Sequence, residues 1–301
     1  MNGFIIVNKQ KGKSSFWAVE RVRRISGQKK VGHAGTLDPL ASGVLVLCLG
    51  EATKLSDYIM DENKTYEVTG KLGERTNTLD AEGYVTEKKD ISGAKLGAEE
   101  IDLVLDDFRG WIEQTPPMHS AIKKDGAPLY KLARRGQTIE RDKRKVLISK
   151  LELLSLELPF YTLRVTCSKG TYIRTLIDDI GVKLGVGSYV TDLKRTSSGS
   201  FNIKDSLTVS DETSPVELKN KLISMEDALS CNVLPVEDVP YELAKRISHG
   251  YSLLELDPEL ANKHKTFVVM SVMNDKRSLV AVVEDKKTAR VFNHSLWSNN
   301  V

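Results

Sequence analysis

The chain has 301 residues, a formal net charge of +3 and 40% hydrophobic residues, which is enough apolar material for one large domain or for a large and a small one. Its three cysteines lie far apart and form no C-x-x-C pair, which argues against a disulfide framework or a thiolate zinc site and favours a reducing cytoplasm. No stretch approaches the roughly 20 apolar residues that a membrane-spanning helix needs, so we expect neither secretion nor membrane insertion.

The basic residues are concentrated in two segments of the sequence. Residues 1–35 carry eight Lys or Arg against one acid, and residues 119–146 carry nine against three, so the rest of the chain is net acidic. This asymmetry favours a polyanionic partner, with nucleic acid the leading candidate, although two solvated faces would give the same pattern.

In chain order, the first predicted elements are a strand, a helix and a second strand. Residues 4–7 (FIIV) form a short apolar run that is typical of a buried strand. Ser14 and Ser15 are residue types that begin helices and Gly27 is one that ends them, so we expect a helix between them with a basic outer face. Residues 43–50 (GVLVLCLG) are apolar and too few for a typical helix, which predicts a fully buried strand.

A half-exposed strand and a second helix follow. Residues 64–72 (KTYEVTGKL) alternate in polarity, so Tyr66 is expected on the apolar side of the strand. Residues 99–110 carry apolar side chains at helical spacing, and Gly110 is the expected end of that helix.

Two neighbouring strands and a third helix complete the larger part of the chain. Residues 145–155 and 160–167 are predicted strands joined by a short proline-containing link. The helix that follows has a continuous apolar face, and Arg174 lies in its first turn, off that face and close to the end of the preceding strand. Because strands and helices do not strictly alternate, we predict an α+β fold with a mixed, mainly antiparallel central sheet flanked by helices.

The C-terminal part is predicted to be a small β-rich domain. A polar stretch around residues 209–221 precedes three apolar segments, 266–274, 278–285 and 289–296, which are typical of strands. We therefore divide the chain into residues 1–233 and 234–301.

Asp38 lies in a glycine-punctuated loop before a buried strand. Taken alone, "LDPL" is a common turn sequence, but Gly32, Gly35 and Gly43 leave backbone space around this carboxylate, as at many catalytic loops. A glycosidase would normally need a second carboxylate, and none lies nearby in sequence. The five histidines are scattered and lack H-x-x-x-H spacing, so no metal site is expected.

Four segments in order resemble the TruB family of tRNA pseudouridine synthases. They are "GHAGTLDPLASGVL", "KTYEVTGKLGERTNTLDAEG", "PPMHSAIKKDGAPLYKLARRG" and "CSKGTYIRTLIDDIG", and the resemblance spans roughly residues 3–200. One departure is Gln10, which stands where the family has a proline, in a turn away from the chemistry.

The resemblance implies an isomerase that converts the uridine at position 55, in the T loop of tRNA, to pseudouridine. The uracil is detached from the ribose, turned in place and rejoined through C5, so the reaction needs no redox change and no cofactor. One carboxylate then suffices, and by resemblance it is Asp38. Whether it attacks the sugar, attacks the base or removes a ribose proton is open at this stage.

The other site residues carry over position by position. Tyr66 resembles the family tyrosine that stacks on the target base and helps remove the C5 proton, and Arg174 resembles the arginine that pairs with the catalytic aspartate. Tyr172 and Leu193 resemble pocket-lining residues, and His33 resembles the histidine that meets the RNA beside the flipped nucleotide. Two basic positions near the cleft match as well: Lys9 and Lys64.

The expected partner is tRNA, bound through its T stem-loop by the two basic segments, with no membrane, no small-molecule cofactor and a monomeric protein. The target base must be flipped out of its stack to be reached. The C-terminal part is similar in size and position to the PUA-type RNA-binding domain of relatives, or else is a structural appendage. Two alternatives stay open here: an RNA chaperone without chemistry of its own, and a glycoside hydrolase that would release free uracil.

Overall fold

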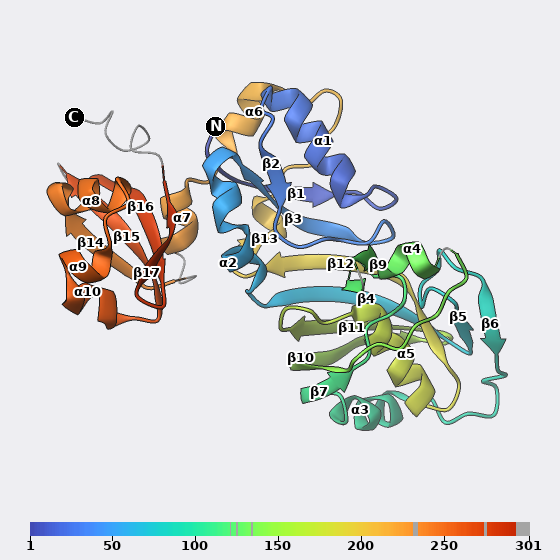
Figure 1. Ribbon diagram of the computed structural model, residues 1–301. Coiled ribbons are helices and arrows are strands. Elements are labelled where there is room, and N and C mark those ends of the chain that lie inside the picture. The colour runs from blue at the N-terminus through green and yellow to red at the C-terminus, as the bar shows by residue number, and fades with distance from the viewer. Residues whose placement is uncertain (121, 125, 134, 231–233, 274–275, 293–301) are drawn as a thin grey trace.

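A mixed sheet forms the centre of the larger part of the protein (Figure 1). The computed structural model describes residues 1–292 except 121, 125, 134, 231–233 and 274–275. Within them the sheet has the order β1-β3-β12-β4-β11-β10-β7, with β2 beside β3 and β13 beside β12. Its strands are β1 (Gly3–Lys9), β2 (Val31–His33), β3 (Ser42–Leu49), β4 (Lys64–Leu72), β7 (Gly110–Gln114), β10 (Arg144–Glu157), β11 (Phe160–Cys167), β12 (Ser188–Ser198) and β13 (Phe201–Asn202).

The pairing in this sheet confirms the predicted fold class. The pair β12–β3 is parallel and brief, joining Lys194 to Ser42 and Arg195 to Gly43, whereas the other pairs of the sheet are antiparallel. The predicted strands joined by a proline-containing link are β10 and β11, which pair directly across residues 158–159.

β3 is buried on both faces, as its continuous apolar sequence predicts. Leu45 and Leu47 pack into the apolar cluster on the side of helices α1 (Ser15–Ser26), α3 (Ala98–Asp106) and α5 (Ile173–Lys183). Val44 and Val46 pack into a second cluster on the opposite face. β4 instead alternates between buried and half-buried residues, which confirms its predicted half-exposed character.

α1 begins and ends at the residues that the sequence indicates. The Ser14 side chain accepts a hydrogen bond from the Trp17 backbone N–H, and Gly27 ends the helix at a φ of 65°, a left-handed conformation that glycine adopts readily. α3 is shorter than predicted, because Asp107 already stands at its C-terminal cap and Gly110 begins β7.

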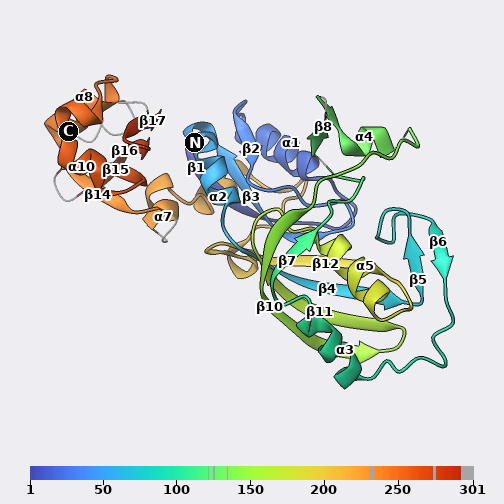
Figure 2. The same cartoon turned by 60° about the horizontal axis from the view of Figure 1, so that its bottom comes forward.

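Short elements surround the sheet. Figure 2 shows that β8 and α4, which belong to the second basic segment, lie apart from the central sheet. The short elements are η1 (Gly50–Leu55), α2 (Ser56–Met60), β5 (Glu74–Thr76), β6 (Val85–Lys88), β8 (Lys123–Lys124), β9 (Ala127–Pro128), α4 (Leu129–Ala133), η2 (Ile203–Asp205), α6 (Pro215–Asn220) and α7 (Met225–Ser230).

The C-terminal part forms a separate four-stranded sheet with the order β14-β15-β16-β17. Its strands are β14 (Val236–Pro240), β15 (Thr266–Met273), β16 (Lys276–Glu284) and β17 (Lys287–Val291). This part contains more helix than predicted. Three helices lie between β14 and β15 in the sequence: α8 (Tyr241–Ser248), α9 (Leu253–Leu256) and α10 (Pro258–Lys263). The third predicted strand ends at Val291, and residues 293–296 lie outside the described residues.

The C-terminal sheet packs against η1 and α2 of the larger part. The hydroxyl of Tyr58 donates to the carboxylate of Glu284, and Lys54 Nζ donates to the backbone oxygen of Val291 at 2.7 Å. The Lys54 ammonium also lies 5.4 Å from the centre of the Phe292 ring. Buried residues of both parts share the second apolar cluster, so the two sheets meet over a packed interface.

Among the residues that the structure describes, no helix is both long and apolar enough to cross a lipid bilayer.

Candidate functional site

A cleft of about 720 Å³ lies where the Asp38 loop, β4, β12 and the start of α5 converge. Its lining includes six of the eight residues predicted for the site: Asp38, Lys64, Tyr66, Tyr172, Arg174 and Leu193. These residues come from segments more than 150 positions apart in sequence, which the sheet order brings together. His33 and Lys9 are not part of the lining.

The loop that carries Asp38 is fixed on both sides of that residue by the first residue of α1 and by the turn before α1. The Ser15 hydroxyl donates to the backbone oxygen of Leu37 at 3.0 Å and accepts from the Leu37 N–H at 2.8 Å. The Gly12 N–H donates to the backbone oxygen of Pro39 at 2.8 Å. These bonds fix the backbone on both sides of Asp38, whose side chain lines the cleft.

Arg174 contacts both carboxylate oxygens of Asp38, one by a hydrogen bond and the other as an ion pair. Its Nε lies 2.9 Å from Asp38 Oδ2, and its Nη2 donates to Asp38 Oδ1 at 3.2 Å. The Arg174 side chain is 5% exposed, whereas that of Asp38 is 37% exposed. A buried guanidinium thus orients a partly exposed carboxylate that a substrate can reach.

Other groups hold the Arg174 guanidinium in turn. It donates from Nη1 to the backbone oxygen of Thr78 at 2.9 Å and from Nη2 to that of His119 at 2.8 Å. A second carboxylate, Asp80, lies 3.4 Å from Nη1. Because Asp80 is itself buried and bonded to the Thr78 hydroxyl, its charge balances the arginine without competing for the cleft.

The strand register aligns three further positions beside Asp38. Arg195 of β12 pairs with Gly43 of β3 on one side and with Tyr66 of β4 on the other. Its side chain is fully buried and donates from Nε to the backbone oxygen of Val44 at 2.6 Å and from Nη2 to that of Gly35 at 3.0 Å. Arg195 therefore ties the glycine loop before Asp38 to the strand that carries Tyr66.

Tyr66 and Leu193 form the apolar part of the cleft. Tyr66 is 9% exposed and Leu193 is 5% exposed, so each presents a small edge to the opening. Burial raises the pKa of the Tyr66 hydroxyl, and the neighbouring Arg195 partly offsets this effect. At neutral pH the side chain is a neutral phenol, whose ring can stack on a base and whose hydroxyl can exchange a proton.

Tyr172 and Lys64 also line the cleft. The backbone of Tyr172 exchanges two hydrogen bonds with the Gln114 side chain, at 2.7 and 3.0 Å, and the Arg144 guanidinium lies 5.8 Å from its ring centre. Lys64 lines the cleft but donates to the backbone oxygens of Met60 and Glu62, and burial lowers its pKa to about 8.

Lys9 lies against the Asp38 loop, outside the lining of the cleft. Its side chain is fully buried, and Nζ donates to the backbone oxygens of Lys13 at 2.5 Å, Gln10 at 3.1 Å and Pro39 at 3.4 Å. Burial lowers its pKa to about 8, with Asp38 acting in the opposite direction. Enclosed in this way, the ammonium group joins the Asp38 loop to the turn before α1, and the predicted contact of Lys9 with RNA stays a prediction.

His33 lies on β2, half-buried, and pairs by register with Leu47. Burial lowers the pKa of its imidazole, and the positive charge of Arg195 acts in the same direction. The imidazole is therefore neutral at physiological pH.

Sequence reasoning missed Asp80 and Arg195. Asp80 follows Leu79, which adopts a left-handed φ of 63°, a conformation that is costly for leucine and common at constrained sites. The one available signal was that "TLDAEG" repeats the Thr-Leu-Asp of the Asp38 loop. Arg195 had no local signal, because an arginine in an alternating strand gives no indication that its charge will be buried.

Together these groups can activate a substrate at one carboxylate and retain an aromatic base beside it. Asp38 can act as a nucleophile or a base, and Tyr66 can stack on the base and exchange a proton. Among the described residues, no group of three His, Cys, Asp or Glu side chains is arranged to hold a metal ion.

Comparisons with known proteins identify matching sequences over most of the chain. Residues 23–173 match the model of the "TruB family pseudouridylate synthase (N terminal domain)", and residues 174–239 match that of the "tRNA pseudouridylate synthase B C-terminal domain". The second match runs from α5 to β14 and so crosses residue 233, which leaves the predicted domain boundary a prediction.

Curated relatives and solved structures agree with these matches. The chain is 50% identical to the tRNA pseudouridine synthase B of Pseudomonas fluorescens (strain Pf-5) and 48% identical to that of Pseudomonas aeruginosa (strain UCBPP-PA14), in each case over 69% of this chain and 68% of the relative. Two solved structures share its fold, each over 97% of this chain with a TM-score of 0.69. They are a Cbf5-Nop10-Gar1 complex, 23% identical over 84% of that chain, and an H/ACA RNP bound to a substrate RNA containing 2'-deoxyuridine, 22% identical over 85%.

Proposed function

The chain belongs to the TruB family of pseudouridylate synthases, and from that premise we propose that it isomerises the uridine at position 55 in the T loop of tRNA. It is a tRNA pseudouridine synthase, an isomerase. To this activity our proposal adds the position modified, the flipping of the base and the role of Asp38. The observation that carries it is the contact between Arg174 and Asp38, a hydrogen bond and an ion pair, in a cleft that Tyr66 also lines.

One accessible carboxylate fits this reaction. The bond between uracil N1 and the ribose breaks, the base turns within the cleft, and a bond forms between C5 and the ribose while the C5 proton leaves. Asp38 acts as nucleophile or base in the first step, because its contact with Arg174 holds the carboxylate in a cleft that a substrate can enter. The buried Asp80 is bonded to Thr78 and serves to balance charge, so a glycosidase-like pair of exposed acids is not supported.

Tyr66 and Leu193 support a role in retaining the base. A uridine in a folded tRNA arm must be flipped out of its stack, at a cost of a few kcal/mol. Stacking of a base on an aromatic ring contributes about 1 to 3 kcal/mol, and contacts with phosphates add further binding energy. The Tyr66 hydroxyl, kept protonated by its raised pKa, can take part in the removal of the C5 proton only by exchange with another group or with water.

Basic groups around the cleft are suited to hold the phosphates of the T stem-loop. Arg144, Lys145 and Lys169 lie in the lining of the cleft, beside the predicted contacts Tyr172 and Lys64. We assign His33 to the RNA surface next to the flipped nucleotide, and we propose that the C-terminal sheet extends this surface as a PUA-type domain.

Release of tritium from C5 tests the proposal. An unmodified tRNA transcript labelled with tritium at C5 of uridine should lose tritium to water when it is mixed with the wild-type protein. The Asp38→Asn variant should release none and still bind the transcript, because the amide keeps the size of the side chain and loses its charge. A transcript with cytidine at position 55 is the matched substrate control.

The outcomes separate the candidate functions. Equal release by the wild-type protein and Asp38→Asn would remove Asp38 from the mechanism. Binding and refolding of tRNA without release would favour an RNA chaperone, and free uracil as a product would favour a glycoside hydrolase. Release that persists with cytidine at position 55 would reject the proposed position.

A further inference from the structure

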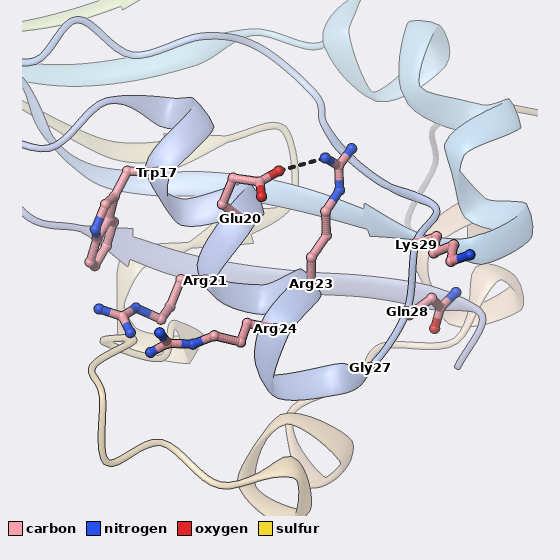
Figure 3. Close-up of a pocket in the computed structure, with 8 residues that line it drawn as sticks. All are labelled: Trp17, Glu20, Arg21, Arg23, Arg24, Gly27, Gln28 and Lys29. Atoms are coloured by element: carbon pink, nitrogen blue, oxygen red, sulfur yellow. Dashed lines mark hydrogen bonds and ion pairs between the residues drawn. The ribbon is translucent and has the colours of Figure 1, made fainter.

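The exposed side of α1 carries a cationic hollow that shares no lining residue with the cleft (Figure 3). Its volume is about 690 Å³. Four of the lining residues are cationic and one is acidic, so it is net positive even before a partner arrives. It is lined by Trp17, Glu20, Arg21, Arg23, Arg24, Gly27, Gln28 and Lys29.

The Trp17 ring contacts two cationic side chains. The Arg21 guanidinium lies 5.3 Å from the centre of the Trp17 ring, and the Lys13 ammonium lies 5.4 Å from it. The Arg21 side chain is only 13% exposed, so its charge is fixed in position before any ligand binds. A preorganised guanidinium loses less conformational freedom on binding than a mobile surface lysine.

Arg21 and Arg24 converge on one carboxylate oxygen. Both guanidinium groups bond to Asp211 Oδ1, and Arg24 does so at 2.7 Å. Figure 3 shows them pointing to the same side of α1, whereas Arg23 pairs with Glu20 on the other side. Two full positive charges face one negative charge, which is the arrangement that a phosphate with several acceptor oxygens would satisfy better than a carboxylate does.

Asp211 is presented to the arginines by a turn. The Ser210 N–H donates to the Thr213 hydroxyl at 3.0 Å, and the Asp211 side chain is 73% exposed. The turn lies directly before α6, whose capping box at Ser214 and Glu217 fixes its start. An exposed acid held against two arginines can be exchanged for another anion without disturbing the core.

Helix α1 connects the hollow with the loop that carries Asp38. Ser15, at the first position of α1, bonds to Leu37, the neighbour of Asp38. Arg24 lies nine residues further along the helix, which corresponds to about 14 Å at 1.5 Å per residue. That distance equals roughly four nucleotides at the 3.4 Å rise of one strand, so a single strand of that length spans α1 from Ser15 to Arg24.

Resting on the proposed function, we propose that Arg21 and Arg24 bind a backbone phosphate of the substrate RNA and that Asp211 is a built-in competitor for that position. In the free protein Asp211 occupies the phosphate position. Binding of RNA exchanges one anion for the other, so Asp211 lowers the affinity for RNA in general and leaves the chemical step untouched.

Removal of the competitor distinguishes this role from a structural one. Asp211→Asn should bind an unmodified tRNA transcript about threefold more tightly than the wild-type protein at 0.1 M KCl. The matched control is Asp107→Asn, which removes the acid of another surface pair, 2.7 Å from Lys183, and should leave the affinity unchanged. If Asp211 only fastened its turn to α1, its removal would leave the affinity unchanged or lower it.

Removal of the arginines tests the phosphate contact itself. Arg21→Gln with Arg24→Gln should weaken tRNA binding about tenfold, and the plot of log affinity against log salt concentration should become shallower by about 1. The double lysine variant should keep the wild-type slope, because it keeps both charges. Urea denaturation should confirm that all of these variants are folded.

An Asp211→Asn variant that binds no more tightly than Asp107→Asn, or a double glutamine variant with the wild-type salt slope, would overturn the inference. Failure of the proposed function would appear differently, as an absence of tritium release from the wild-type protein itself.

Discussion

At the scale of single residues, one arginine organises the candidate site. Arg174 bonds to the exposed carboxylate of Asp38 and pairs with the buried carboxylate of Asp80, and the backbone oxygens of Thr78 and His119 hold it in place. The positive charge of Arg174 lies between the two carboxylates and offsets their mutual repulsion. Asp38 therefore combines an ordered position with access to a substrate.

The hydroxyl of Tyr66 is the group whose contribution a single substitution isolates. Tyr66→Phe keeps the ring in the cleft and removes the hydroxyl. We expect tRNA binding close to that of the wild-type protein and a rate of tritium release lower by about 100-fold, the lower limit for loss of a proton-transfer group. Single-turnover release at saturating protein measures this rate. A wild-type rate would exclude the Tyr66 hydroxyl from proton transfer.

At the scale of elements, the brief parallel pairing of β3 with β12 positions the site. Gly43 at the start of β3 has a φ of 99°, and a Cβ placed on it would lie 2.2 Å from the backbone oxygen of Arg195. No side chain fits there unless the two strands separate. Because Arg195 also pairs with Tyr66 in the register, the contact sets the spacing of three strands at once.

Gly43→Ala should disrupt this arrangement. We expect the free energy of unfolding to fall by about 2 to 4 kcal/mol, from the left-handed φ and the overlap with Arg195 together, and tritium release to fall with it. Urea denaturation measures the first effect. The matched control is Gly93→Ala, where a Cβ would meet no atom within 4 Å. Equal stability of the two variants would show that β3 and β12 tolerate a wider spacing.

At the scale of the whole molecule, the two sheets share apolar packing. Val268, Met270 and Val282 of the C-terminal sheet belong to the same buried cluster as Phe4 and Val44 of the larger part. The polar contacts of Tyr58 and Lys54 lie at the edge of that interface. The C-terminal part is therefore integrated into the core, which bears on how its predicted role in RNA binding is tested.

Deletion of residues 234–301 should weaken tRNA binding more than it slows single-turnover chemistry at saturating protein. It should also lower the stability of the remainder, because it exposes part of the shared cluster. Thermal unfolding and dye binding to exposed apolar surface report the second effect, and filter binding reports the first. An unchanged dissociation constant in a truncated protein that remains folded would reject an RNA-binding role for this part.

Local patterns in the sequence predicted the main elements of the larger part and the loop that carries Asp38, but not helices α8, α9 and α10 of the C-terminal part. Alternating polarity predicted the buried side of β4, a continuous apolar run predicted that β3 is buried on both faces, and Ser14 and Gly27 marked the ends of α1. Periodicity and end signals act within a few residues of the chain, so a single sequence carries them in full.

Only the tertiary structure decided which charges are buried and which meet. The pairing of Arg174 with Asp38 and Asp80, the burial of Lys9 and Arg195, and the convergence of Arg21 and Arg24 on Asp211 depend on the strand order and on contacts between distant segments. A charged side chain has the same local signal whether it faces water or is enclosed by backbone oxygens. Its environment is set by the elements that pack around it, and these come from elsewhere in the chain.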